Sequence, residues 1–313
     1  MKIGLHANLL DHRGNSTVIY DYAMALRKYF GYDTCVVSSR QKSTHPMERF
    51  QSIGYSLYDN PSEITSIVEK EKIDVMYMTT AGADEGFTPK NCKTAIHCVF
   101  NMEHQFGDVY AGVSEWLANR FNKPLWVPHI INLPTPTKTL HSELGIPEKD
   151  FIVGRIGGYE QFNVPFAYDA IQRTLNVRKD IWFVFLNTEP KIQHERVKYI
   201  PFHPDPIFKS NFILTCDVML HARMDGETFG LAVGEFSSLN KPILTYDAPH
   251  WWYMRAHLHM LGEKAIKYKN EEELLGYLLQ IDKEYVKDVD WDCYSKPFSP
   301  ENVIKKFNDV FIK

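Results

Sequence analysis

The chain has 313 residues, 44% of them hydrophobic and 24% charged, which is enough for two globular domains with separate cores. A formal net charge of −4 argues against a nucleic-acid partner, because neutralising phosphates requires a basic surface. No apolar run reaches the roughly 20 residues needed to cross a bilayer, and the chain opens on a strand pattern without a signal peptide. We therefore expect a cytoplasmic protein without a transmembrane segment, and leave peripheral contact with a membrane open.

Strand-like and helical patterns alternate over the first part of the chain. A short apolar run at 2–8 leads through a glycine-containing turn into a helical pattern that extends to 29. Further strand-like runs follow at 34–38, 73–78, 94–99 and 109–113. Strands that alternate with helices predict a mostly parallel sheet covered on both faces. Residues 1–133 are thus expected to form a Rossmann-like domain.

A second unit of the same kind is predicted after a proline-rich stretch, which is typical of a linker. Four prolines mark that stretch: Pro124, Pro128, Pro134 and Pro136. Strand candidates then lie at 151–156, 182–186, 197–200, 218–221 and 243–246, with helical patterns at 166–175, 206–215 and 231–239. We expect a second Rossmann-like domain at 134–298, and a terminal helix at 299–313 that can pack back on the first.

The loop after the strand at 218–221 has the features of an anion site. In an open parallel sheet, ligands bind beyond the carboxyl ends of the strands, where this loop lies. The backbone amides of Phe229, Gly230 and Leu231 would form a helix N-terminus, which carries partial positive charge and unpaired donors. Gly230 lets the backbone approach the anion, so the pattern predicts a diphosphate at this position.

Glu227 and Glu235 lie in and after the same loop. Two carboxylates beside a diphosphate would repel it, so we expect both to bind hydroxyl groups. A charged hydrogen bond of this kind contributes roughly 1.5–3 kcal/mol. We therefore assign Glu227 to a transferred sugar and Glu235 to a ribose, with Thr228 in the same donor-binding loop.

Several motifs resemble those of one enzyme family. The run G-E-T-F-G-L-A-V-G-E at 226–235 resembles the E-x7-E motif of retaining GT-B glycosyltransferases of the family 4 type. The run V-G-R-I-G-G at 153–158 resembles the opening of their second domain. The runs R-G-N-S-T-V-I-Y-D-Y-A, Y-A-G-V-S-E-W-L and P-L-W-V-P-H extend the similarity over most of the chain. The resemblance implies two Rossmann-like domains facing a cleft, the first for the acceptor and the second for the nucleotide sugar. It also implies metal-independent transfer of a sugar with retention of configuration.

The same resemblance implies roles for residues of the second domain. Arg155 matches the family arginine that holds the donor diphosphate, and Gly158 belongs to the same segment. Many relatives have a lysine a few residues later, where 157–161 here is G-G-Y-E-Q. Either Arg223 or Arg13 replaces that charge, or the diphosphate binds more weakly.

Four further positions match places where relatives contact substrates. His97 ends a strand near the expected position of the transferred sugar, and His104 is a weaker candidate, although either histidine could be structural. Arg13 and Gly14 lie in a turn that resembles the glycine loop of the first domain, or simply begin a helix. Phe202 lies where relatives hold the nucleobase through backbone atoms, or packs in the core.

The predicted enzyme takes a nucleotide diphosphate sugar, with UDP or GDP as the base-bearing part, and a carbohydrate or glycoconjugate acceptor. No cofactor and no metal are expected. Asp288 and Asp290 form a D-x-D that superficially resembles a metal site, but it lies in a charged stretch and not after a core strand. Two alternatives remain, a sugar-nucleotide epimerase and a non-catalytic sugar-nucleotide-binding protein. The G-x-G-x-x-G signature of an NAD enzyme is absent.

Overall fold

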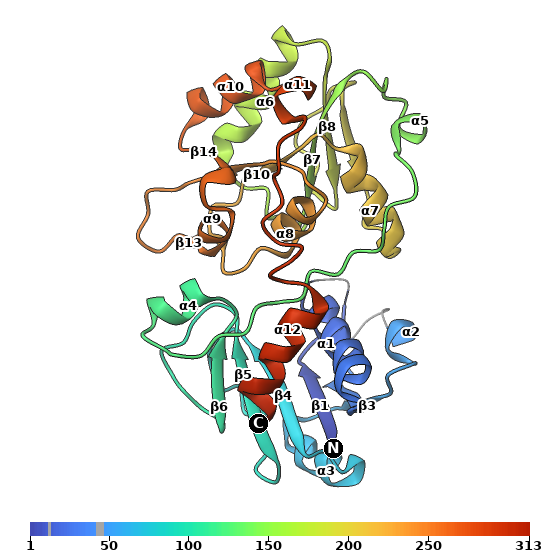
Figure 1. Cartoon of the computed structure of the whole chain (residues 1–313), viewed down its shortest axis with the longest axis vertical. Coiled ribbons are helices and arrows are strands. Elements are labelled where there is room, and N and C mark those ends of the chain that lie inside the picture. The colour runs from blue at the N-terminus through green and yellow to red at the C-terminus, as the bar shows by residue number, and fades with distance from the viewer. Residues whose placement is uncertain (12–13, 42–46) are drawn as a thin grey trace. The chain divides into compact units, whose positions relative to one another are not determined.

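The computed structural model describes residues 1–11, 14–41 and 47–313. The chain divides into two compact units, whose elements are labelled in Figure 1. Unit 1 combines Met1–Asn132 with the C-terminal Lys296–Lys313, and unit 2 is Leu133–Ser295. The boundaries expected from the sequence, after 133 and after 298, lie one and three residues further along the chain.

In its described residues, unit 1 contains a six-stranded sheet in which every strand pair is parallel. The strand order is β3-β2-β1-β4-β5-β6, so the chain returns to the middle of the sheet after β3. The elements are β1 (Lys2–Ala7), α1 (Gly14–Phe30), β2 (Asp33–Ser39), α2 (Met47–Phe50), β3 (Tyr55–Tyr58), η1 (Pro61–Glu63), α3 (Ile64–Glu71), β4 (Val75–Thr80), β5 (Lys93–Cys98), β6 (Val109–Gly112) and α4 (Glu115–Arg120).

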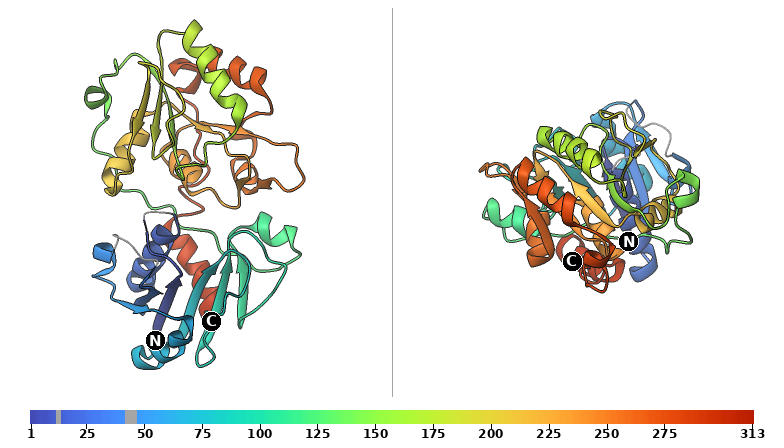
Figure 2. Two further views of the ribbon diagram at one scale, coloured as in Figure 1. Left: turned by 180° about the vertical axis from the view of Figure 1, so that it is seen from behind. Right: turned by 90° about the horizontal axis from the view of Figure 1, so that it is seen from above.

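The C-terminal segment completes unit 1. Helix α12 (Pro300–Phe307) begins at Pro300, which suits the first helical position, and the Ser299 hydroxyl caps it. Val303, Ile304 and Phe307 form its buried face, which packs on α1, and the Phe307 ring centroid lies 4.9 Å from that of Tyr22. A final turn, η3 (Asn308–Ile312), ends the chain. The last residues therefore belong to the first core, as Figure 2 also shows.

Unit 2, in which every residue is described, has a second six-stranded parallel sheet of order β14-β12-β10-β7-β8-β9. When the strands are numbered within this sheet, their order is the same as in unit 1, and β11 and β13 pair separately as a two-stranded sheet. The elements are α5 (His141–Leu144), β7 (Phe151–Ile156), α6 (Pro165–Val177), β8 (Ile181–Leu186), β9 (Val197–Ile200), α7 (Pro206–Thr215), β10 (Val218–His221), β11 (Gly226–Glu227), α8 (Leu231–Ser238), β12 (Ile243–Tyr246), β13 (Met254–Arg255), α9 (Ala256–Leu261), η2 (Gly262–Lys264), β14 (Ala265–Tyr268), α10 (Glu271–Gln280) and α11 (Lys283–Val286).

Amphipathic helices cover the sheet of unit 2. Helices α6 and α10 lie side by side, as Figures 1 and 2 show, and turn apolar side chains at helical spacing into the core. The buried residues of α6 are Ala167, Ala170, Ile171, Thr174 and Leu175, and those of α10 are Leu274, Leu275 and Leu278. In the described parts of the chain, no helix combines the length and the apolar character needed to cross a membrane.

The central strand β7 requires a glycine at one position. A Cβ atom on Gly154 would lie 2.2 Å from the Cys216 Sγ and 2.8 Å from its Cβ, closer than any ordinary contact. Gly154→Ala should therefore lower the free energy of unfolding by about 1–3 kcal/mol, the typical cost of overpacking a core. Urea unfolding of the full chain measures this change.

Gly276→Ala is the matched control, because a Cβ at this position of α10 meets no atom within 4 Å. It should leave stability unchanged or raise it by up to about 1 kcal/mol, since alanine is the better helix former. Adding Cys216→Ala to Gly154→Ala should restore part of the loss. Equal effects of the two glycine substitutions would contradict the packing argument.

Candidate functional site

The candidate site lies at the carboxyl edge of the unit 2 sheet, between two adjacent parallel strands. β7 and β10 pair directly, and the chain leaves them toward opposite sides of the sheet, which makes a topological switch point. Arg155 is the second-last residue of β7, and His221 is the last residue of β10. Ligands of open α/β sheets bind beyond the strand ends at such a point.

Arg155 is buried and fastens two loops. Its Nη1 donates to the Asn187 carbonyl at 3.2 Å and to the Thr188 hydroxyl, and its Nη2 donates to the Gly158 carbonyl at 2.8 Å. Burial lowers the pKa of Arg155 to about 10, so the guanidinium is still charged at neutral pH. In this structure Arg155 holds together the segments that follow β7 and β8.

The glycines after β7 leave room for the Arg155 guanidinium in this position. A Cβ on Gly157 would lie 2.5 Å from the Arg155 Nη2, so any side chain there would displace the guanidinium. The Gly158 carbonyl accepts from Arg155, and the Gly158 amide donates to the Gln161 Oε1 at 3.2 Å. An incoming diphosphate would therefore share the guanidinium with protein oxygens, or replace them.

Glu227 lies at the centre of a charged cluster. Its Oε2 accepts from the Arg223 Nη1 at 2.8 Å, and its Oε1 lies 3.4 Å from the His221 Nε2. Burial alone would raise the pKa of Glu227, but the hydrogen bond with His221 and the positive charge of Arg223 lower it to about 2. The carboxylate is thus ionised at neutral pH, with its side chain 20% exposed.

Arg155 belongs to the same electrostatic region as this cluster. Beyond burial, the charges that act on its pKa include Glu227, which raises it, and Arg223, which lowers it. The structure therefore brings together Arg155 and Glu227, which the sequence assigned to one donor site, and adds Arg223.

A second layer of hydrogen bonds holds His221 in place. Its Nδ1 lies 2.9 Å from the Thr245 hydroxyl, which in turn lies 3.2 Å from the His257 Nε2. Burial lowers the pKa of His257 well below its ordinary value, so this ring is neutral. We did not predict His221 from the sequence. The available signal is a polar residue that ends the apolar strand V-M-L-H at the carboxyl edge.

One arginine donor of the cluster has no hydrogen-bond partner in the described parts of the chain. The Arg223 Nε is buried and makes no hydrogen bond in the structure, while the Nη1 of the same side chain binds Glu227. Buried polar groups are nearly always paired, so an unpaired N–H in a candidate site indicates where a ligand atom can bind. Of the two arginines expected to replace the missing lysine, Arg223 belongs to this cluster, and Arg13 lies outside the described residues.

Helix α8 begins next to Glu227. Gly230 is its N-cap in the left-handed conformation, with φ +82°, and a Cβ there would lie 3.3 Å from the Glu227 Cβ and Cγ. Glycine at this position lets the carboxylate lie against the helix start. The first helical residue is Leu231, so the predicted helix N-terminus is confirmed at the expected place.

Thr228 and Phe229 are buried, in contrast to side chains that line a binding surface. The Phe229 ring packs on Tyr294 with centroids 5.8 Å apart, and the Phe229 carbonyl accepts from the Tyr294 hydroxyl at 3.2 Å. The side chain of Phe229 therefore anchors the loop. Any contribution of these two residues to a donor site comes through their backbone.

Glu235 and Phe202 have surroundings that the sequence did not indicate. Glu235 is buried on α8 and forms an ion pair with Lys209 of α7, which occupies the carboxylate assigned to a ribose. Phe202 is 39% exposed in the segment before α7, so the alternative of core packing is wrong for this residue.

His97 is enclosed in the core of unit 1. The ring is fully buried, with Nδ1 2.6 Å from the Tyr77 hydroxyl and Nε2 2.8 Å from the Val127 carbonyl. Rings of His129 and Phe311 pack around it. The expectation that His97 contacts a sugar is therefore wrong in this structure. Both ring nitrogens lie within hydrogen-bond distance of core groups, and no part of the ring is exposed.

The remaining predicted positions that the structure describes lie on the surface. Gly14 is the exposed first residue of α1, and His104 is exposed. Asp290 pairs with Lys264 at 2.9 Å. In the ranges that the structure describes, no three His, Cys, Asp or Glu side chains converge as ligands for a metal ion.

Neither a protein-family model nor a curated protein matches the sequence. Solved structures do match its fold. HepE (Alr3699) of Anabaena, in complex with UDP-glucose, has a TM-score of 0.73 at 13% identity, over 99% of this chain and 98% of HepE. A glycosyltransferase from Rickettsia africae has a TM-score of 0.71 at 11% identity, over 99% and 97% of the two chains.

A putative UDP-N-acetylglucosamine 2-epimerase from Listeria monocytogenes is also similar, with a TM-score of 0.58 at 13% identity over 97% and 94% of the two chains. At such identities the likeness establishes the fold alone. The predicted fold class is confirmed: the chain is an α/β protein with two Rossmann-like parallel sheets, as in GT-B glycosyltransferases.

The low pKa of Glu227 can be tested through its histidine partner. His221→Phe removes the hydrogen bond to the carboxylate but keeps a ring of similar size. The pKa of Glu227 should then rise from about 2 toward the ordinary glutamate value of about 4.3, because burial is no longer offset as fully. Carbon-13 NMR titration of the side-chain carboxyl measures it. His259→Phe, on the exposed face of α9, is the control. An unchanged pKa of Glu227 in both variants would show that His221 does not stabilise the carboxylate.

Proposed function

We propose that the chain is a retaining glycosyltransferase that moves a sugar from UDP or GDP to a hydroxyl group of a carbohydrate or glycoconjugate, without a metal ion. One observation carries the proposal. At the switch point of unit 2, the ionised Glu227 is held by Arg223 and His221, beside the start of α8 and in the field of Arg155. This combination offers positive charge for a diphosphate and a carboxylate for sugar hydroxyls.

Departure of the diphosphate leaves negative charge on its oxygens, so catalysis requires donors that are already in place. Three features of unit 2 supply them: the Nε–H of Arg223, the guanidinium of Arg155 and the N-terminus of α8. Charge-assisted hydrogen bonds to phosphate are about twice as strong as neutral ones. Arg223 thereby takes the part of the lysine that relatives have after the Arg155 position.

Glu227 is suited to bind the sugar rather than to attack it. Its carboxylate shares a hydrogen bond with Arg223, which offsets the repulsion between a carboxylate and a nearby phosphate. In the proposed reaction the bond between the anomeric carbon and the phosphate oxygen breaks, and its electrons go to the diphosphate. The acceptor oxygen bonds to the same face of the sugar, and its proton goes to the departing phosphate. No covalent sugar–enzyme bond is needed.

The similarity to a UDP-N-acetylglucosamine 2-epimerase favours a second candidate function on the same fold, isomerisation of a nucleotide sugar without an acceptor. Both functions need the diphosphate site of unit 2, and only transfer needs a second substrate. The products of the reaction therefore distinguish them.

The decisive experiment incubates the full chain with UDP- and GDP-sugars, with and without a panel of neutral and anionic glycosides. We expect release of the nucleoside diphosphate and a glycoside product of unchanged anomeric configuration, with equal rates in EDTA. An isomerised nucleotide sugar formed without acceptor would favour the epimerase. Donor binding with no product of either kind would favour a binding protein, and a loss in EDTA that metal restores would contradict metal independence.

Two substitutions separate donor binding from transfer. Arg155→Ala should lower donor affinity or turnover by at least about tenfold, since one charged hydrogen bond contributes roughly 1.5–3 kcal/mol. Glu227→Gln should impair transfer much more than binding of the free nucleoside diphosphate, because the carboxylate is assigned to the sugar. Calorimetry with the free nucleotide and steady-state kinetics measure the two effects.

Arg173→Ala is the matched control, because this exposed arginine pairs only with surface glutamates of α10 in the hydrogen bonds of the structure. Melting temperatures of all variants show whether the buried Arg155 is needed for folding. Unchanged kinetics in a folded Arg155→Ala protein, or equal losses of binding and transfer in Glu227→Gln, would overturn the respective assignment.

A further inference from the structure

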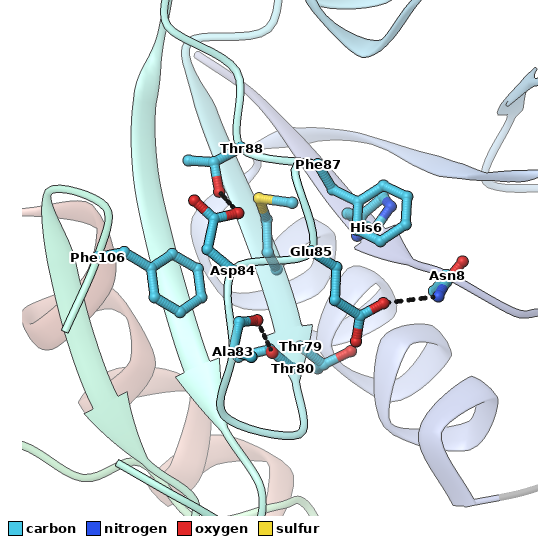
Figure 3. Close-up of a pocket in the computed structure, with 11 residues that line it drawn as sticks. His6, Asn8, Thr79, Thr80, Ala83, Asp84, Glu85, Phe87, Thr88 and Phe106 are labelled. Atoms are coloured by element: carbon cyan, nitrogen blue, oxygen red, sulfur yellow. Dashed lines mark hydrogen bonds between the residues drawn. The ribbon is translucent and has the colours of Figure 1, made fainter. Parts of the chain in front are cut away.

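A hollow lies in unit 1, at the switch point of its sheet. β1 and β4 are adjacent parallel strands there, and the residues at and just beyond their carboxyl ends line the hollow together with the segment that follows β4. Figure 3 shows these side chains, which include His6 and Asn8 from β1 and its end, and Thr79 from β4. None of them takes part in the unit 2 site.

Three buried polar atoms of this hollow have no hydrogen-bond partner among the residues that the structure describes: the His6 Nδ1, the Asn8 Oδ1 and the Thr79 Oγ1. His6 is only 2% exposed, and its other nitrogen lies 2.9 Å from the Tyr58 hydroxyl. Burial lowers the pKa of His6 to about 3, so its ring is neutral. The free nitrogen therefore accepts or donates one hydrogen bond, as the tautomer dictates. Unpaired buried atoms on side chains that line one hollow point to a ligand.

The lining also contains acidic and aromatic side chains. The Glu85 carboxylate accepts from the Asn8 side-chain amide at 3.2 Å, and Asp84 accepts from the Thr88 hydroxyl at 3.2 Å. The Phe87 ring packs on His6 with centroids 5.2 Å apart. Among the described residues around the hollow, none is a lysine or an arginine.

We propose that this hollow binds an uncharged, polyhydroxylated ligand, a neutral saccharide, and rejects anionic ones. Sugar hydroxyls donate to the Glu85 carboxylate and the Asn8 carbonyl oxygen, and they either donate to or accept from His6 and Thr79. A ring such as Phe87 offers an apolar face for the C–H groups of a sugar. A phosphate or carboxylate would meet Glu85 and Asp84 with no described cation to offset them. As the acceptor site, this assignment rests on the proposed glycosyltransferase function.

The test uses saturation-transfer NMR on the full chain with five small probes. The neutral probes are the methyl α-glycosides of glucose, galactose and mannose, and the anionic ones are glucose 6-phosphate and glucuronate. We expect saturable binding of at least one methyl glycoside and none of the two anions. Absence of a signal from all three methyl glycosides would overturn the proposal, as would tighter binding of glucose 6-phosphate than of methyl glucoside.

Two variants locate the binding site. Glu85→Gln and Thr79→Val should each weaken glycoside binding, the former by at least about fivefold because a charged acceptor is lost. Glu69→Gln, an exposed carboxylate at the end of α3, is the matched control and should change nothing. Equal binding in all folded variants, checked by their melting temperatures, would place the saccharide elsewhere.

Donor binding is measured on the same samples, so the two proposals fail separately. Nucleotide-sugar binding without any glycoside binding would overturn the unit 1 site and leave the transferase proposal standing. Glycoside binding that Glu85→Gln abolishes, in a protein without nucleotide-sugar binding, would retain the unit 1 site and overturn its role as an acceptor site.

Discussion

In both units the first strand of the sheet lies beside the fourth, and this strand order determines where ligands can bind. At that point the chain leaves two neighbouring parallel strands in opposite directions, so a crevice lined by side chains can form beyond the strand ends. In unit 2 the strand ends contribute Arg155 and His221, and in unit 1 they contribute His6 and Thr79. The same topology thus builds two separate candidate sites.

The two switch points differ in charge, and that difference indicates different ligands. Unit 2 places two arginines and a helix N-terminus around one carboxylate, a balance that suits a diphosphate next to a sugar. Unit 1 places Asp84 and Glu85 around neutral polar atoms, which suits hydroxyl groups and opposes anions. Under the two proposals, the anionic diphosphate would bind to unit 2 and the neutral saccharide to unit 1.

Local sequence patterns predicted much of the fold and part of the candidate site, and long-range contacts determine the remaining features. The apolar runs at 151–156 and 218–221 match β7 and β10 residue for residue, whereas the mixed runs of β3 and β14 were not predicted. Glu227 was assigned to the donor loop because its place after a buried strand is local information. Two of the three partners of Arg155, Asn187 and Thr188, lie more than 30 residues away along the chain, beyond any local pattern. His97 and His221 both lie at strand ends, and only their tertiary partners separate a core histidine from one bound to Glu227.

Buried polar atoms without partners bear on the choice between transfer and epimerisation. Each such atom destabilises a fold by about 1–3 kcal/mol when neither protein nor solvent pairs with it. An epimerase handles only a nucleotide sugar, so it would use the unpaired Arg223 Nε in the unit 2 site and would have no part for the three unpaired atoms at the unit 1 hollow. A transferase needs a second substrate that brings hydroxyl groups of its own. The proposed saccharide site of unit 1 would hold that second substrate, and this is where transfer and isomerisation differ on a fold found in a glycosyltransferase and in a putative epimerase.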